Sequence, residues 1–197
     1  MASDFTNFCC RSGGSNLNAG TRTGDTTEPA TSADLTYASG SWVQATAVFT
    51  VASGDPVADG VAVGDFASVY ADGSTTTGYV GRVTARTSTT ITVPSTASSV
   101  TKPTDGTNTR TLKIGGAWLG PNAAEAFPFG FLASACIKAV SGAWPRCNLK
   151  NDQTYSITAA MTQNLALVNF RGYSSAYEDS GRATSDSGLF VSRLSIS

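Results

Sequence analysis

The sequence predicts a mainly β protein, and two observations lead to that prediction. From residue 35 to residue 116, apolar and polar residues alternate in short runs, with turn signals about every 8–12 residues. Charged residues make up only 14% of the chain, below the roughly 25% of an average globular protein. We therefore expect a small antiparallel β-barrel or sandwich. A short helix and a truncated parallel β-helix-like region are expected to follow it.

The antiparallel unit is expected to contain about five or six strands. Ala47, Phe49 and Val51 share one face of an alternating run, which is the pattern of a half-buried strand. The later expected strands are Phe66 to Tyr70, Gly78 to Ala85, a TTITV run with Ile91 and Val93, and an RTLKI run that ends at Ile114.

Residues 1–34 are expected to form an extended N-terminal arm. Ser12 to Ser32 are polar, rich in Gly and Thr, and show no periodicity. This composition is typical of a mobile terminus, or of an arm that lies across a neighbouring subunit.

Residues 117–197 are expected to form the third unit, a short capping helix plus β-helix-like coils. Pro121 is an acceptable helix entry, and Pro128 and Gly130 interrupt the helical pattern. A short amphipathic helix here would cover the apolar cross-section of the first coil. Short strands and polar turns follow from Cys147 onward, and we expect no more than about two coils before Ser197.

The four cysteines are Cys9, Cys10, Cys136 and Cys147. Adjacent side chains of a strand point to opposite faces, so Cys9 and Cys10 are not expected to pair with each other. Cys136 and Cys147 are the candidate disulfide, because Gly142 and Pro145 permit a chain reversal between them. The alternative is that all four thiols stay reduced as small hydrophobic residues, which cytosolic synthesis favours.

A run of aromatic residues around Pro128 is the strongest interface candidate. One short helix cannot bury all of them, although burial between the barrel and the coils is an equal alternative. The candidate interface residues are Trp118, Phe127, Phe129, Phe131 and Trp144.

The residue types present exclude several kinds of chemistry. The chain has no histidine, which rules out catalytic triads and dyads that use an imidazole, and no metal or cofactor motif is present. The net charge is -1 and basic residues are spread singly, so no nucleic-acid surface is expected. We also expect no membrane span and no signal peptide, which implies synthesis in the cytosol.

Carboxylate pairs that could hydrolyse a glycosidic bond are the remaining catalytic possibility. Glu178, Asp179 and Asp186 lie close together in a polar loop, where they are more simply turn formers and solubilising charges. Most other acids sit at turn positions, before Pro or Gly: Asp55, Asp59, Asp72 and Asp105. We therefore predict no catalytic residues.

Two stretches resemble known families. The order NLKNDQTYSIT, LVNFRGYSS and EDSGRAT, within about residues 118–197, resembles the N-terminal entry of pectate-lyase-like right-handed β-helix proteins. The phage members of that superfamily are tailspikes and tail fibres, usually trimers. VFTVASGDPVADGVAVGDFASVYADG with GRVTARTSTTITV is similar to small β-barrel modules of phage head and tail proteins. Tailspike carboxylates that cleave carbohydrate lie on later coils, which are not expected here.

The resemblance implies a non-enzymatic structural protein of a tailed-bacteriophage virion. It would be a head decoration or a fibre or spike base, located on the virion, and would assemble as a homo-oligomer, most simply a trimer, with other virion proteins as partners. The alternative is an extracellular carbohydrate-binding module that uses Tyr173 and Tyr177 as sugar platforms. A truncated polysaccharide lyase or hydrolase is the third hypothesis.

Overall fold

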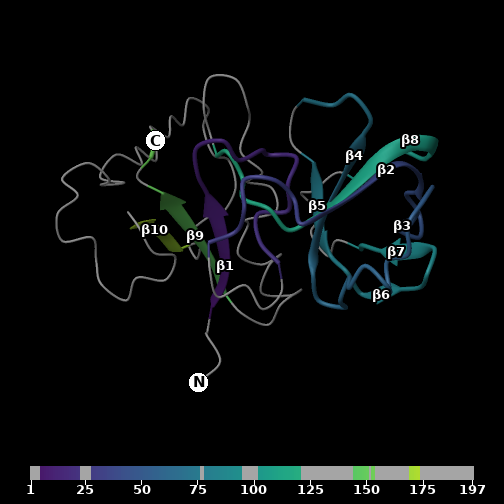
Figure 1. Cartoon of the computed structure of the whole chain (residues 1–197), viewed down its shortest axis with the longest axis horizontal. Helices are drawn as coiled ribbons and strands as arrows, with labels where there is room; N and C mark the ends of the chain where they lie inside the picture. The colour runs from purple at the N-terminus through teal and green to yellow at the C-terminus, as the bar shows by residue number, and fades with distance from the viewer. Residues whose placement is uncertain are drawn as a thin grey trace.

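The computed structural model describes residues 5–22, 28–75, 78–94, 102–120, 144–150, 152–153 and 169–173. These residues form strands in two sheets, and no helix occurs among them (Figure 1). The prediction of a mainly β protein with an antiparallel unit is therefore confirmed. The expected capping helix and most of the expected coils lie outside the described residues.

The larger sheet has seven strands and is antiparallel throughout. Its order is β5-β4-β8-β2-β3-β7-β6. The strands are β2 (Leu35–Val43), β3 (Val48–Thr50), β4 (Phe66–Ala71), β5 (Tyr79–Arg82), β6 (Ala85–Arg86), β7 (Thr90–Thr92) and β8 (Gly106–Ile114).

The two edge strands of this sheet, β5 and β6, are consecutive in the chain. Only Val83 and Thr84 separate them, so one bent segment forms both edges. The amide of Thr84 also donates to the carbonyl of Thr92, at 3.0 Å, which continues the β6–β7 ladder. The sheet therefore curls until its edges meet, as in a small barrel.

Inward-facing residues of the curled sheet form one core. Phe49 is fully buried and Val51 packs against the core, as the alternation predicted, whereas Thr50 between them is exposed. Trp42 and Tyr79 meet across the core with ring centroids 5.9 Å apart. The buried core residues are Tyr37, Trp42, Ala47, Phe49, Val61, Ala67, Val69, Tyr79, Val83, Ile91, Val93, Leu112 and Ile114.

The smaller sheet has three parallel strands in the order β1-β9-β10. They are β1 (Phe5–Cys10), β9 (Trp144–Lys150) and β10 (Asn169–Tyr173), which lie beside the barrel in Figure 1. Parallel neighbours need a crossover of about a dozen residues or more. Residues 151–168 connect β9 to β10, whereas β1 and β9 are joined through the whole barrel.

Aromatic stacking joins strand β1 to the barrel. The Phe8 ring stacks on Trp118 with centroids 5.0 Å apart, and meets Phe66 of β4 edge-on at 5.1 Å. The amide of Trp118 donates to the carbonyl of Cys9, and that of Arg11 donates to the carbonyl of Trp118. Both sheets are thus in contact through one buried aromatic cluster.

The segment after β1 differs from the expected free arm. Residues 11–22 contain no strand, as their composition predicted, but buried amide side chains anchor them. Asn18 donates to the carbonyls of Thr31 and Ala117, both at 2.8 Å, and Asn16 exchanges two hydrogen bonds with Gly120. Polar composition alone could not reveal these partners, because Ala117 and Gly120 lie about a hundred residues away along the chain.

Gly20 makes a further close contact in this segment. Its φ is +85°, and a Cβ atom placed there would lie 2.5 Å from the Trp118 ring. Only glycine combines this left-handed backbone with so close an approach.

Candidate functional site

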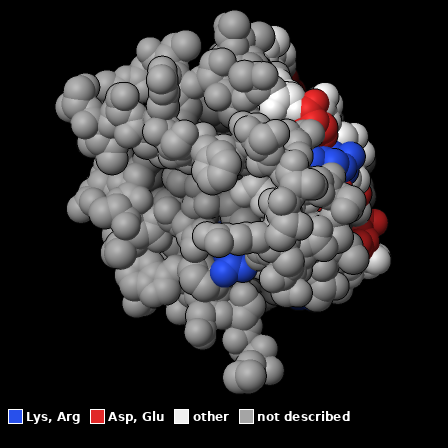
Figure 2. All heavy atoms as spheres, turned by 90° about the vertical axis from the view of Figure 1, so that its left-hand side faces the viewer, with Lys and Arg blue, Asp and Glu red and all other residues white. Residues whose placement is uncertain are grey.

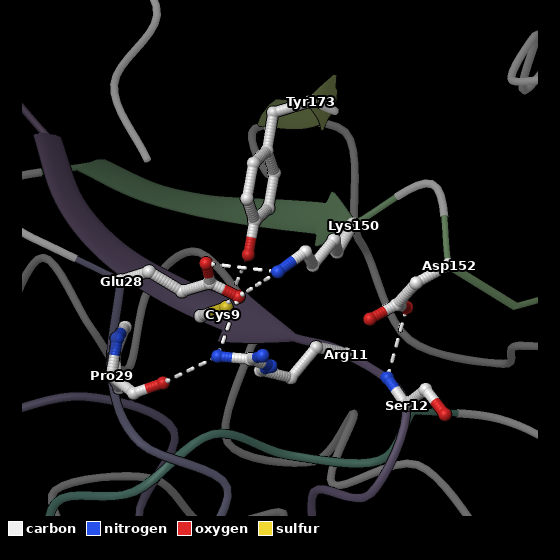
Figure 3. A network of polar contacts seen from close by, with 8 residues as sticks. All are labelled: Cys9, Arg11, Ser12, Glu28, Pro29, Lys150, Asp152 and Tyr173. Atoms are coloured by element: carbon white, nitrogen blue, oxygen red, sulfur yellow. Dashed lines mark hydrogen bonds and ion pairs between the residues drawn. The ribbon is translucent and has the colours of Figure 1, made fainter. Parts of the chain in front are cut away.

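A partly buried carboxylate, Glu28, is the centre of the densest polar cluster among the described residues (Figure 3). Its Oε1 atom lies 2.7 Å from Arg11 Nη1, and Lys150 Nζ donates to Oε1 at 2.9 Å and to Oε2 at 3.1 Å. Arg11 follows β1, Lys150 ends β9, and Glu28 belongs to the loop before β2. The carboxylate therefore links three segments that are distant in sequence.

Next to this carboxylate, the Cys9 sulfur and the Tyr173 hydroxyl oxygen are 2.9 Å apart, on β1 and β10. The pKa of the Cys9 thiol is raised to about 12, because the effect of burial outweighs the opposing effect of the hydrogen bond with Tyr173. Burial, followed by the nearby Cys9, also raises the pKa of Tyr173. Since the thiolate is the reactive form of cysteine, Cys9 is an unreactive thiol at neutral pH.

The Arg11 end of the cluster also holds backbone groups. Arg11 Nη1 donates to the carbonyl of Pro29 at 3.4 Å, and the amide of Ser12 donates to Asp152 Oδ1 at 2.9 Å (Figure 3). We define Cys9, Arg11, Glu28, Lys150 and Tyr173 as the Glu28 cluster. Its groups bind one another across the parallel sheet and link β1, β9 and β10 to the loop before β2.

A second polar cluster lies where the N-terminal segment crosses the barrel. Arg22 Nε is 3.2 Å from Asp65 Oδ2, and Arg22 Nη2 donates to the carbonyl of Gly60 at 2.5 Å. Burial raises the pKa of the adjacent Asp34, and the charge of Asp65 adds to this shift while Arg22 opposes it. Asp34 packs against Gly115, where any Cβ atom would collide with its carboxylate.

Of the acids predicted to be turn formers, Asp55 accepts amides of its own turn, and Asp59, Asp72 and Asp105 bind residues that are distant in sequence. Asp55 Oδ1 accepts the amides of Val57 and Ala58, and Asp105 Oδ1 accepts the amide of Gln44. Asp59 accepts the Tyr37 hydroxyl at 2.9 Å, and Asp72 accepts the Thr111 hydroxyl at 2.6 Å. Glu178, Asp179 and Asp186 lie outside the described residues.

The candidate interface residues are not all available to a partner. Trp118 is fully buried, stacked on Phe8, and its Nε1 donates to the carbonyl of Asn18 at 2.8 Å, so it is a core residue. Trp144 begins strand β9. Phe127, Phe129 and Phe131 lie outside the described residues.

One member of the candidate disulfide, Cys147, lies beside Cys10 in the structure. Cys147 is a free, buried thiol, and its sulfur lies 3.6 Å from that of Cys10, while Cys136 lies outside the described residues. Cys9 and Cys10 point to opposite faces of β1, as predicted, because one contacts Tyr173 and the other Cys147.

Tyr173 does not fit the role of an exposed sugar platform. Its side chain is only 3% exposed and its hydroxyl group faces Cys9. Tyr177, the other tyrosine of that hypothesis, lies outside the described residues. The carbohydrate-binding hypothesis therefore loses one of its two named residues.

Sequence reasoning missed the Glu28 cluster. Arg11, Glu28 and Lys150 are isolated charges in the sequence, and no local pattern distinguishes them from solvated residues. The one available signal was the position of Arg11 and Lys150 at the ends of apolar strands. Charge pairing between distant segments cannot be read from one sequence.

The remaining surface and ligand-binding features are those of the described part of the chain. Figure 2 shows acidic and basic side chains next to one another along one margin of the face that carries the parallel sheet. No group of three or more His, Cys, Asp or Glu among these residues could hold a metal ion. Within the same residues, no helix is long and apolar enough to cross a membrane. Comparisons with protein-family models, curated proteins and solved structures found no match.

Proposed function

We propose that this chain is a non-enzymatic structural protein of a tailed-bacteriophage virion. It would serve as a head decoration or as a fibre or spike base, and assemble as a homo-oligomer, most simply a trimer. Residues beyond the three-stranded parallel sheet would continue it as right-handed β-helix coils. Residues 121–143, which include the aromatic run, would supply the capping helix and the main contact between subunits.

The observation that carries this proposal is the parallel pairing of β9 with β10. Arg146 pairs with Asn169 and Lys150 pairs with Tyr173, so paired residues are 23 positions apart in the sequence (169 − 146 and 173 − 150). In a parallel β-helix, a strand of one coil pairs in parallel with the corresponding strand of the next coil, one coil length further along the chain. The pairing supports the resemblance to tailspike and fibre proteins on which the proposal rests.

The two described polar clusters support a structural role. Glu28 is held by two cations, Asp65 is held by Arg22, and Cys9 carries a thiol with a raised pKa. These groups bind one another and fix the positions of chain segments. A network of this kind is suited to a rigid assembly component.

Strand edges give a route to assembly. Among the described residues, β1 and β10 are the edges of the parallel sheet, and edge strands present backbone groups to further strands. A second copy of the chain, or this chain's own further coils, would pair there. In contrast, the barrel joins its two edges through Val83 and Thr84.

The first test is the solution mass of the full chain by size-exclusion chromatography with light scattering. We expect a stable trimer at micromolar concentration, which Phe129→Ser weakens. Val63→Ser is the matched control, because Val63 is 58% exposed on the barrel. A monomer at micromolar concentration, or a trimer that both variants weaken equally, would contradict the proposed assembly.

The location on a virion needs a separate measurement. Purified particles of the phage or prophage that encodes the chain would be examined by quantitative mass spectrometry. We expect its peptides at a fixed ratio to the major capsid protein that persists after a high-salt wash. Absence from washed particles would contradict the virion assignment without affecting the oligomer result.

A further inference from the structure

Two buried thiols face each other between the first and the ninth strand. The sulfur atoms of Cys10 on β1 and Cys147 on β9 lie 3.6 Å apart, and both side chains are fully buried. The two residues are 137 positions apart in the sequence. The contact therefore joins the N-terminal strand to the region beyond the barrel.

The register explains how the two side chains meet. Phe8 pairs with Cys147 and Cys10 pairs with Leu149, so the cysteines are diagonal neighbours on one face of the sheet. Diagonal side chains remain within reach of each other across adjacent strands. Their sulfur atoms must approach by only about 1.5 Å to reach the length of a disulfide bond.

We propose that Cys10 and Cys147 form a redox modification site, at which a disulfide oxidant couples the two thiols and fastens β1 to β9 covalently. One thiolate attacks a sulfur of an oxidant such as glutathione disulfide, which forms a mixed disulfide and releases one glutathione. The second thiolate then displaces the other glutathione. The two cysteines are oxidised by two electrons, and their two protons end on the two glutathione thiols.

Burial controls when this reaction takes place. Burial raises the pKa of the Cys10 thiol well above its usual value of 9.0, and the hydrogen bond with Cys147 adds to that shift. The docked pair therefore resists attack by an external oxidant. Reaction with the oxidant requires β1 to detach, and re-docking then places the second sulfur beside the mixed disulfide.

This pairing is independent of the proposed function and differs from the candidate suggested by the sequence. Proximity in sequence favoured Cys136 with Cys147, eleven positions apart. The fold instead brings Cys147 to Cys10 and turns Cys9 to the other face, toward Tyr173. A cytosolic chain would keep the pair reduced, and an oxidising exterior would close it.

The test is oxidation of the purified full chain with glutathione disulfide, followed by alkylation with N-ethylmaleimide and digestion with trypsin. Trypsin separates the thiols well, because Cys147 lies in peptide 147–150, Cys136 in peptide 114–138, and Cys9 with Cys10 in peptide 1–11. We expect peptide 1–11 linked to peptide 147–150, with a mass about 2 Da below the sum of the two reduced peptides.

Two adjacent substitutions identify the cysteine within peptide 1–11. Cys10→Ser is expected to lower the yield of the linked peptide by at least about tenfold, and Cys9→Ser to leave it within about twofold. Equal loss in both variants would overturn the assignment. So would linkage of peptide 114–138 to peptide 147–150 as the main product.

A measurement on the parent chain keeps the test independent of how the variants fold. The same oxidation is repeated in urea, where all four thiols are equally accessible. We expect the 1–11 to 147–150 linkage to dominate under native conditions and to be one of several products in urea. An identical distribution under both conditions, or four fully alkylated cysteines after native oxidation, would refute the proposal.

Discussion

Replacing Phe8 with alanine tests whether β1 belongs to the folded unit. The Phe8 side chain is fully buried between Trp118 and Phe66, with ring centroids 5.0 and 5.1 Å away. Truncating a buried phenylalanine removes its burial energy and leaves a cavity, at a total cost of about 3–5 kcal/mol. With a urea m value of about 2 kcal/mol/M, the unfolding midpoint would fall by roughly 2 M.

The assay is urea unfolding followed by tryptophan fluorescence, to which Trp118, stacked on Phe8, contributes together with Trp42 and Trp144. Val63→Ala is the control, because a valine that is 58% exposed should change stability by less than about 0.5 kcal/mol. A loss below about 1 kcal/mol for Phe8→Ala would refute the reasoning, because that is the response of a mobile arm.

Three further changes test other parts of the structure. Glu28→Gln should lower the free energy of unfolding by about 1–2 kcal/mol, because Arg11 and Lys150 lose a shared carboxylate. This loss of stability should be smaller in roughly 1 M salt, and urea unfolding midpoints at two salt concentrations measure both effects. Ser39→Gly should stabilise the protein by up to about 1 kcal/mol in thermal unfolding, since exposed Ser39 has a φ of 53°; a lower melting temperature would contradict this. Burial raises the pKa of Cys9 from 9.0 to about 12, so the folded state keeps a proton that the unfolded state releases. The stability of the parent protein should therefore fall as pH rises from 9 towards 12, and that of Cys9→Ser should fall less steeply. Urea midpoints that fall equally with pH in both proteins would refute the assignment of this effect to Cys9.

The barrel strands were predictable because their signals are local. The expected strand from Phe66 to Tyr70 corresponds to β4, and the RTLKI run lies in β8. The expected strand from Gly78 to Ala85 is divided into β5 and β6, since the chain bends at Val83 and Thr84 to close the sheet. Alternation marks a strand but carries no information on where it bends.

The place of β1 in the parallel sheet and the Glu28 cluster were not predictable for a different reason. The residues Phe5 to Cys10 have strand character, yet their partner in β9 begins at Trp144. The polar segment that follows β1 suggested an arm, because the buried hydrogen bonds of Asn16 and Asn18 go to distant carbonyls. Strand pairing over such distances depends on the whole fold and produces no periodic pattern of residues in the sequence.

The pairing of β1 with β9 also has a consequence for synthesis. β1 leaves the ribosome before its partner β9, which ends at Lys150, so about 140 further residues must be made before the two strands can meet. At about 5–20 residues per second, this delay lasts roughly 7–28 seconds. The barrel can fold during that time, while the strand FTNFCC waits with its apolar face open. Release of incomplete chains would therefore expose an aggregation-prone strand, and a chaperone that binds apolar segments would raise the yield of the full chain.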